Sequence, residues 1–285
     1  MTDTAMRTAL VLGAGGVTGA GWEIGILRGL AEAGTDLTSA DLVLGSSAGA
    51  VVGAQVASGT FPLDALYDSQ LGAPEGESAA RLRFGQIVRY ALAVLGSKSA
   101  EQYGRKLGRL ATAADTVTPE ARREVIAGRL GPAVEWPERR LLVTAVDADS
   151  GELVAYDKDA GVPLTDAVTA SCAIPGVWPV VELAGRRLLD GGIYSTANAH
   201  LAAGYRSVVV IAPSAAGSKV IHSPARQAAA LAAAGATVEL ITPDAESRRA
   251  FGRNPLDPSR RGPAASAGRA QAAAHARAVA ALWAQ

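Results

Sequence analysis

The chain has 285 residues, 49% of them hydrophobic, 19% charged and 5% aromatic, a composition that supports a buried core and excludes a disordered chain. Its 27 basic and 27 acidic residues give zero net charge, so nucleic acid is not an expected partner of the chain as a whole. The single cysteine, Cys172, excludes an internal disulfide and a thiolate zinc cluster and indicates a cytoplasmic protein. We expect one domain over residues 1–285, without a secretory signal or a membrane-spanning helix.

Two strand–turn–helix units open the chain. Residues 8–12 are an apolar run that ends in glycines, and residues 22–30 place apolar side chains at helical spacing. Residues 42–44 and 50–57 repeat this order around a turn at residues 45–49. Two such units in succession predict a parallel sheet.

Residues 61–132 follow with almost no strand pattern, and we interpret them as a helical insertion after the second unit. One segment within it has apolar residues at i, i+3, i+4 and i+7, namely Phe84, Ile87, Val88, Ala91, Leu92 and Leu95. This pattern predicts an amphipathic helix. Such a helix either covers the core or acts as an interfacial lid in peripheral contact with a membrane, and the sequence leaves both interpretations open.

Further apolar runs at residues 141–146, 180–183, 187–189 and 207–212 are strand candidates, with residues 238–241 as a late edge strand. Together with the first two units they predict an α/β fold, a three-layer sandwich with a mainly parallel central sheet.

Residues 215–285 are expected to extend this core by a strand and a helix. Within them, residues 252–268 are rich in Pro, Gly, Ser and Arg, which predicts a mobile loop. The alanine-rich stretch that follows up to Trp283 predicts a helix docked on the rest of the chain.

The sharpest motif is Gly-Ser-Ser-Ala-Gly at residues 45–49, a G-x-S-x-G match between an apolar strand and a helix. In a nucleophile elbow the central serine occupies a strained turn that exposes its hydroxyl, and small flanking residues avoid collisions with the neighbouring helix and strand. Ser47 is therefore the candidate nucleophile. The alternative is a small-residue turn in which Ser47 only caps the following helix.

A glycine-rich loop at residues 13–19 lies at the first strand-to-helix turn, where unpaired backbone N–H groups and the positive end of a helix form an anion-binding site. The loop suits either an oxyanion hole or the phosphates of a dinucleotide. A dinucleotide fingerprint calls for a third glycine where Thr18 stands, and for an acidic residue after the second strand, where Leu44 and Gly45 stand. The pattern thus favours the oxyanion hole, with nucleotide binding as the alternative.

Asp190 ends an apolar strand candidate and is followed by Gly191 and Gly192. By itself such a sequence is usually a surface turn. In a parallel sheet, however, the carboxyl ends of the strands line the ligand crevice, which is where residues 13–19 and Ser47 must also lie. We therefore expect Asp190 at the same edge of the sheet.

These motifs, together with Ala-Ser-Cys-Ala-Ile-Pro at residues 170–175, resemble in order and spacing those of the patatin-like phospholipase family, over about residues 7–214. The resemblance implies a three-layer α/β fold and a serine–aspartate dyad that hydrolyses lipid acyl esters without a metal or cofactor. One departure is that the Asn-Pro pair usually found after the family's Asp-Gly motif is absent around residues 195–198.

By position, the resemblance implies Ser47 as nucleophile, Asp190 as its general base, and the N–H groups of Gly15 and Gly16 in the oxyanion hole. The family loop usually carries Arg or Lys where this chain has Thr18. A cation there is a partner for a phosphate or carboxylate group, so we expect Thr18 to contact the substrate and to affect the choice of head group.

A serine–acid–histidine triad is the alternative mechanism, and it needs a histidine late in the chain. The candidates are His200, His222 and His275. A triad fold also brings its serine after several strands, whereas Ser47 follows only two. We therefore expect no histidine in the mechanism.

The first hypothesis is a cytoplasmic serine hydrolase that acts on lipid acyl esters. The expected pocket residues are Ile174, Pro175, Val177 and Trp178. They follow an apolar helix and precede the Asp-Gly-Gly strand, and their apolar side chains suit an acyl chain. No cluster with metal-ligand spacing lies near the motifs. The competing hypotheses are a nucleotide-binding α/β protein that uses residues 13–19 and a catalytically silent lipid-binding relative.

Overall fold

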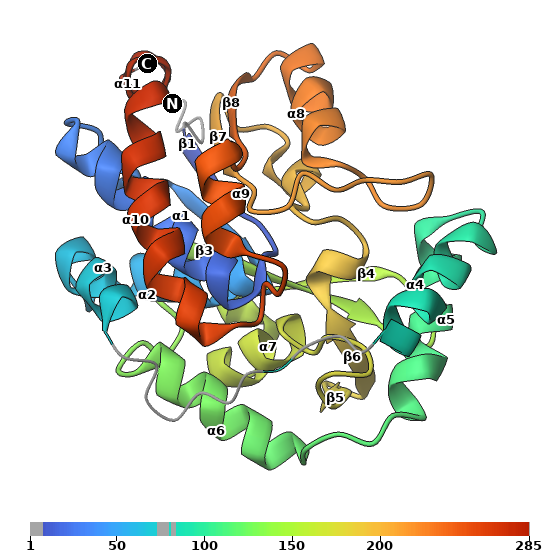
Figure 1. Cartoon of the computed structure of the whole chain (residues 1–285). Helices are drawn as coiled ribbons and strands as arrows, with labels where there is room; N and C mark the ends of the chain where they lie inside the picture. Colours follow the sequence, from blue (N-terminus) through green and yellow to red (C-terminus); the bar gives the residue numbers. More distant parts are fainter. Residues whose placement is uncertain (1–7, 73–79, 81–83, 285) are drawn as a thin grey trace.

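The computed structural model describes residues 8–72, 80 and 84–284 and shows a central β-sheet with helices on both faces (Figure 1). This is the three-layer α/β arrangement expected from the sequence. The strands are β1 (Thr8–Leu12), β2 (Leu42–Ser46), β3 (Arg140–Asp147), β4 (Leu153–Tyr156), β5 (Val181–Leu183), β6 (Arg186–Asp190), β7 (Ser207–Ile211) and β8 (Thr237–Ile241).

The sheet is mainly parallel, as predicted. Its strand order is β5-β6-β3-β2-β1-β7-β8, and β4 pairs with β3 outside this path. The strands β1, β2, β3, β7 and β8 are parallel to one another, whereas β4 and β6 run antiparallel to β3 and β5 runs antiparallel to β6. The structure confirms every strand candidate, including β8 at the edge, and adds β4, which the sequence pattern did not reveal.

The helices fall on both faces of this sheet. They are α1 (Gly16–Glu32), α2 (Ala48–Ser58), α3 (Leu63–Leu71), α4 (Phe84–Leu95), α5 (Ala100–Thr112), α6 (Pro119–Leu130), α7 (Leu164–Ser171), α8 (Pro224–Ala233), α9 (Ala245–Phe251), α10 (Arg261–Gln271) and α11 (Ala276–Trp283). Short 3₁₀ turns lie at Leu37–Ser39, Lys158–Ala160, Gly191–Ile193, Ala199–Ala202, Pro258–Arg260 and Ala272–Ala274. Within the described ranges, no helix is both long enough and apolar enough to cross a bilayer.

The core has one half on each face of the sheet, because successive side chains of a strand point to opposite sides. In β1, Leu10 and Leu12 pack with buried side chains of α1, α2, α7 and α10. Ala9 and Val11 pack on the other face, against the 3₁₀ turn Ala199–Ala202 and α8. Both faces of β1 are thus covered, which leaves the carboxyl edge of the sheet as the place for a site.

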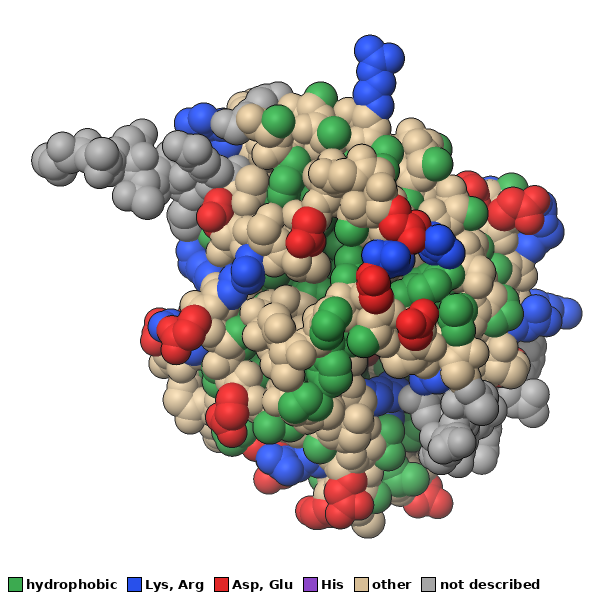
Figure 2. Space-filling view, turned by 90° about the vertical axis from the view of Figure 1, so that its left-hand side faces the viewer, with side chains coloured by type: hydrophobic (Ala, Val, Ile, Leu, Met, Phe, Trp, Pro, Cys, Tyr) green, Lys and Arg blue, Asp and Glu red, His purple; other side chains and the backbone are tan. Residues whose placement is uncertain are grey.

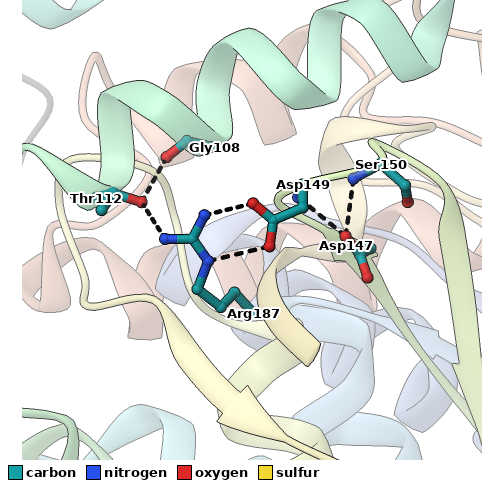
Figure 3. Close-up of polar contacts among 6 residues, drawn as sticks. All are labelled: Gly108, Thr112, Asp147, Asp149, Ser150 and Arg187. Atoms are coloured by element: carbon teal, nitrogen blue, oxygen red, sulfur yellow. Dashed lines mark hydrogen bonds and ion pairs between the residues drawn. The ribbon is translucent and has the colours of Figure 1, made fainter. Parts of the chain in front are cut away.

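The expected insertion contributes α3, α4, α5 and α6, so its described part is helical; residues 73–79 and 81–83 lie outside the described chain. Figure 3 shows how α5 is tied to the sheet. Arg187 of β6 pairs with the carboxylate of Asp149, and its Nη1 donates to Thr112 Oγ1 at 3.3 Å. Asp147 Oδ1 accepts the N–H groups of Asp149 and Ser150, each at 2.9 Å. These contacts fix the end of α5 against the β3–β4 turn.

The assignment of residues 1–285 to one domain stays a prediction.

The expected mobile loop at residues 252–268 is wrong in its second half, where α10 forms. This helix packs lengthwise on α1. A methyl group added at Gly25 of α1 would lie 2.1 Å from the carbonyl oxygen of Ala265, and one added at Gly268 of α10 would lie 2.4 Å from that of Trp22. Small residues on both helices therefore allow the two backbones to touch, and this packing overrides the weak helix propensity of the segment.

Candidate active site

Ser47 lies at the sharp turn between β2 and α2. Its backbone has φ 54° and ψ −116°, a conformation that is strained for a residue other than glycine. A Cβ at Gly45 would lie 2.4 Å from the Gly49 carbonyl oxygen, and one at Gly49 would lie 2.1 Å from that of Leu12. The two motif glycines are therefore needed for the close approach of α2 to β1 and β2, which positions Ser47 at the carboxyl edge of the sheet.

Two consecutive residues at the end of α7 bind the strained peptide of Ser47. Its backbone N–H donates to Ser171 Oγ at 2.8 Å, and its carbonyl oxygen accepts the thiol of Cys172 at 3.3 Å. Ser171 and Cys172 are buried. Burial raises the pKa of the Cys172 thiol to about 12, so it stays protonated and able to donate at neutral pH. The Ala-Ser-Cys-Ala-Ile-Pro stretch thus contacts both polar groups of the candidate nucleophile's backbone.

Asp190 lies beside Ser47, as the sequence led us to expect, but not by the expected route. The strand β6 is antiparallel to β3, so Asp190 does not end a parallel strand. It still reaches the carboxyl edge, because β6 pairs only with the last residues of β3 and places Asp190 opposite Ala145. Ser47 Oγ donates to Asp190 Oδ2 at 2.6 Å, and Oδ1 accepts the N–H of Gly192 at 2.8 Å.

Burial controls the acidity of Asp190, of which 5% is exposed. Removal from water raises the pKa of this carboxyl to about 6, while the Ser47 hydroxyl, the Gly192 N–H and the charge of Arg122 limit the rise. A carboxylate with this pKa is ionised at neutral pH and is more basic than an ordinary aspartate, whose pKa is about 3.9. It is therefore suited to accept a proton from Ser47.

A buried polar cluster joins β2, β3 and the turn after β6. The hydroxyls of Ser46 and Thr144 are 2.7 Å apart, and Asn198 Nδ2 donates to Ser46 Oγ at 2.9 Å and to the Gly191 carbonyl oxygen at 3.0 Å. Asn198 lies in the segment where the sequence departs from the family's Asn-Pro. Since Ser46 precedes the candidate nucleophile and Gly191 follows Asp190, the cluster holds the two segments of the pair in register.

The glycine-rich loop forms the beginning of α1. Gly16 has φ 64° and lines the cavity described below, and a Cβ on it would lie 2.5 Å from the Pro255 carbonyl oxygen. Within the described chain, the N–H groups of Gly15, Gly16 and Ala48 donate to no acceptor. This is expected at the first turn of a helix, and it leaves three available donors. Gly16 and Ala48 line the same cavity as Ser47, and Ala48 was not predicted.

A cavity of about 620 Å³ opens beside Ser47. Its apolar lining comes mainly from α1, α2, α6 and the segment after α7, and includes Val17, Ala20, Ile24, Val51, Val125, Ile174, Trp178 and Leu256. Of the expected pocket residues, Ile174 and Trp178 line it, whereas Pro175 and Val177 do not. Thr18 is also outside its lining; this side chain is fully buried and lies 3.4 Å from the Pro255 carbonyl oxygen. Substrate contact by these three residues stays a prediction.

Arg122 of α6 is a pocket residue that the sequence analysis missed. It is 4% exposed, lines the cavity, and lies with its guanidinium carbon 3.9 Å from the ring centroid of Trp178. Its charge lowers the pKa of Asp190 against the effect of burial. No motif marks this position, because an arginine on a helix is ordinarily a solvated residue.

No histidine hydrogen-bonds to Ser47 or Asp190 within the described residues. His200 Nδ1 is 2.9 Å from Gln227 Nε2, and burial lowers its pKa. His275 Nδ1 is 2.7 Å from Glu239 Oε1. Nor does the described part of the chain hold a group of three His, Cys, Asp or Glu side chains placed to bind a metal.

The fold and the site together define an α/β protein with a serine on a strained strand-to-helix turn and an aspartate hydrogen-bonded to it. The patatin-like phospholipase family model matches residues 10–203. The chain therefore belongs to the patatin-like phospholipase family.

Similar proteins include uncharacterized NTE family proteins of Mycobacterium bovis and Mycobacterium tuberculosis, each 31% identical over 223 residues. The match covers 78% of this chain and 52% of those proteins, so it spans about half the length of these relatives. Among solved structures, the type III effector ExoU aligns over 96% of this chain and 53% of its own, with 16% identity and a TM-score of 0.41. VipD from Legionella pneumophila aligns over 66% and 46%, with 17% identity and a TM-score of 0.37.

Proposed function

We propose that the chain is a serine hydrolase that cleaves lipid acyl esters through an acyl-enzyme, with Ser47 as nucleophile and Asp190 as general base. The observation that carries this proposal is the 2.6 Å hydrogen bond from Ser47 Oγ to Asp190 Oδ2 at the edge of an apolar cavity. Membership of the patatin-like phospholipase family supports lipid esters as the substrate class.

In the acylation step, Ser47 Oγ attacks the ester carbonyl carbon while its proton passes to Asp190 Oδ2. Collapse of the tetrahedral intermediate breaks the bond to the alcohol, which leaves with the proton from Asp190. In the second step, a water molecule gives its proton to Asp190 and attacks the acyl group on Ser47. The carboxylic acid is released and the proton returns to Ser47 Oγ, so the enzyme is unchanged.

The negative charge that forms on the substrate oxygen needs hydrogen-bond donors that are already in place. We assign this role to the N–H groups of Gly15 and Gly16, and we add the N–H of Ala48, which follows the nucleophile at the start of α2. All three lack an acceptor within the described chain. The apolar lining of the cavity then holds the acyl chain, with Ile174 and Trp178 near the reacting groups.

Labelling with a fluorophosphonate tests the proposal, because only an activated serine reacts rapidly with it. We expect labelling of the native chain, with hydrolysis of a medium-chain nitrophenyl ester in the presence of a strong chelator. Ser47→Ala should lose both. Ser58→Ala, at the far end of the same helix, is the matched control and should keep both, since its hydroxyl donates to the Gln55 carbonyl oxygen and accepts the Thr60 N–H and does not contact Ser47. A folded native chain that binds a fatty acid but is not labelled would instead be a catalytically silent lipid-binding relative.

A further inference from the structure

The helix α4 has an apolar face that the rest of the protein does not cover. Ile87 is 51% exposed, Leu92 61% and Leu95 69%, and Val88 beside them is 40% exposed. These four residues, called the α4 face below, account for four of the seven large hydrophobic residues that are exposed in the described chain. An exposed apolar cluster of this kind on one helix is typical of a contact surface for a partner.

The surroundings of the α4 face are basic, although the whole chain is neutral. Residues 84–112, which form α4 and α5, carry five basic residues and one acidic residue. Two ammonium groups lie at the end of α4: Lys219 Nζ donates to the Leu95 carbonyl oxygen at 2.8 Å, and Lys106 Nζ donates to that of Gly96. An apolar helix face framed by lysines and arginines matches the surface of an anionic bilayer, which offers acyl chains beneath negative head groups.

The inner side of α4 contacts the segment that lines the cavity. Tyr90 Oη donates to the Pro175 carbonyl oxygen at 2.7 Å, and Gln86 Nε2 donates to that of Gly176. Ile174 and Trp178, on either side of these carbonyls, line the cavity beside Ser47. Docking through the α4 face would therefore bring the cavity segment to the lipid surface. In Figure 1, α4 and α5 lie at the right-hand side of the molecule, next to β4 and β6.

We propose that the α4 face is the docking surface of this protein for an anionic lipid bilayer. The inference rests on the proposed function for its purpose, which is access to esters held in a membrane, but binding itself needs no catalysis. The sequence left two roles open for this amphipathic helix, a cover for the core and an interfacial lid. The proposal favours the interfacial role.

Sedimentation with vesicles tests the docking surface in a Ser47→Ala background, so that binding is measured without hydrolysis. The probes are vesicles of phosphatidylcholine alone and of phosphatidylcholine mixed with phosphatidylglycerol. We expect binding to the mixed vesicles that weakens as salt is added. Leu92→Ser with Leu95→Ser should weaken it by about tenfold or more, since the buried apolar area is lost. Arg89→Gln with Lys98→Gln should weaken it roughly fivefold per charge.

The matched control is Leu71→Ser, which removes a leucine of 48% exposure at the end of α3. It should bind like the parent chain, and with Ser47 restored every variant should hydrolyse a soluble nitrophenyl ester at the native rate. Equal binding by Leu92→Ser with Leu95→Ser and by the control would overturn the proposal. The proposal would also be overturned if Leu92→Ser with Leu95→Ser lost self-association but kept vesicle binding, because the α4 face would then join two copies of the chain. An inactive native chain that still docks would contradict only the proposed function.

Discussion

Ser47 is held in a backbone conformation that costs on the order of 1–3 kcal/mol, and the hydrogen bond to Ser171 offsets part of this cost. Ser171→Ala removes the acceptor of the Ser47 N–H and leaves that group buried and unpaired, a loss of about 1–3 kcal/mol. If the turn relaxes as a result, the hydroxyl moves away from Asp190. We expect kcat to fall at least tenfold with KM nearly unchanged, measured on a soluble nitrophenyl ester.

Thr169→Ala is the control for this prediction, because it removes another buried hydroxyl from α7. Thr169 Oγ1 donates to the Thr165 carbonyl oxygen inside the helix and does not contact Ser47. The control should cost stability without lowering kcat. Equal effects of the two variants on kcat would show that Ser171 acts only through the stability of α7.

The raised pKa of Asp190 predicts the pH dependence of acylation. The base works only when ionised, so kcat/KM should rise with pH through a midpoint near 6, the pKa of this carboxyl. Arg122→Gln removes a positive charge that lowers this pKa, and the midpoint should move to higher pH. The measurement is the pH–rate profile of both proteins, with folding checked by circular dichroism.

Arg129→Gln is the control for the charge effect. Arg129 lies on the same helix as Arg122 and lines the same cavity, but its charge is not among those that shift the pKa of Asp190. Its profile should keep the native midpoint. A midpoint near 4 in the native chain, or one that Arg122→Gln leaves in place, would argue against Asp190 as the base.

The residues predicted from sequence and those missed differ in the kind of signal they carry. Ser47 and Asp190 sit in short motifs whose glycines report the local backbone, so their position at one sheet edge was predictable. Ser171 is 124 residues from Ser47 in the chain, and its hydroxyl bond depends on how α7 packs. Asn198 and Arg122 likewise contribute through contacts that only the folded chain brings together.

At the scale of elements, the contact of α1 with α10 explains why a segment rich in Gly, Ser and Pro becomes helical. Gly21, Gly25 and Gly29 follow one another at every fourth residue of α1, on the side that faces α10. A Cβ at Gly25 would collide with the backbone of Ala265, which cannot move without shifting α10. We therefore expect Gly25→Ala to destabilise the protein by about 1–3 kcal/mol, the usual cost of overpacking a core.

Gly128→Ala on α6 is the matched control in this urea-unfolding experiment. An added methyl group there meets nothing within 4 Å, so alanine should stabilise the helix by roughly 0.5–1 kcal/mol. A Gly25→Ala variant as stable as the native chain would mean that α10 is not held by the close contact with α1.

The elements also show where local sequence patterns stop being sufficient. Hydrophobic runs located the strands because a run of apolar residues is visible in the local sequence. The direction of a strand relative to its neighbours in the sheet is not. The run that became β6 carries no sign that it pairs antiparallel with β3. Residues 252–268 have the composition of a loop. Part of them is helical because the glycines of α1 let the backbone of α10 pack directly against α1. The described strands other than β4 were thus predictable, whereas their order and the helix at the C-terminal side depended on distant partners.

At the scale of the whole molecule, the zero net charge is built from interspersed charges. Figure 2 shows Lys and Arg beside Asp and Glu over the face that lies at the left of Figure 1. Arg28 and Glu32 of α1 form ion pairs with each other, with Asp64 of α3 and with Arg269 of α10. Exposed pairs such as these add little stability each. The ionisable group that matters most for the pH dependence of stability is instead buried on the same helix.

Glu23 of α1 is fully buried, and no side chain of the described residues hydrogen-bonds to its carboxyl oxygens. Burial raises its pKa well above 4.5, so the folded protein keeps this proton after the unfolded chain has lost it. Below the unfolded pKa both states are protonated and Glu23 costs nothing through its charge. As the pH rises above it, the unfolded chain is favoured and stability falls, until the folded pKa is reached.

Glu32 at the end of the same helix has the opposite effect on how stability depends on pH. Its hydrogen bonds to Arg269 lower its pKa, so its contribution is present above the unfolded pKa and is lost as the pH falls through the folded pKa. Glu23→Gln should therefore be more stable than the native chain at about pH 8 and equal to it at about pH 4, whereas Glu32→Gln should be less stable at about pH 8 with the gap narrowing in acid. Urea midpoints of the three proteins at both pH values measure this. If Glu23→Gln showed the same gap at both values, the carboxyl would carry the same charge in the folded and unfolded states, and its burial would not be the source of a pH-dependent loss of stability.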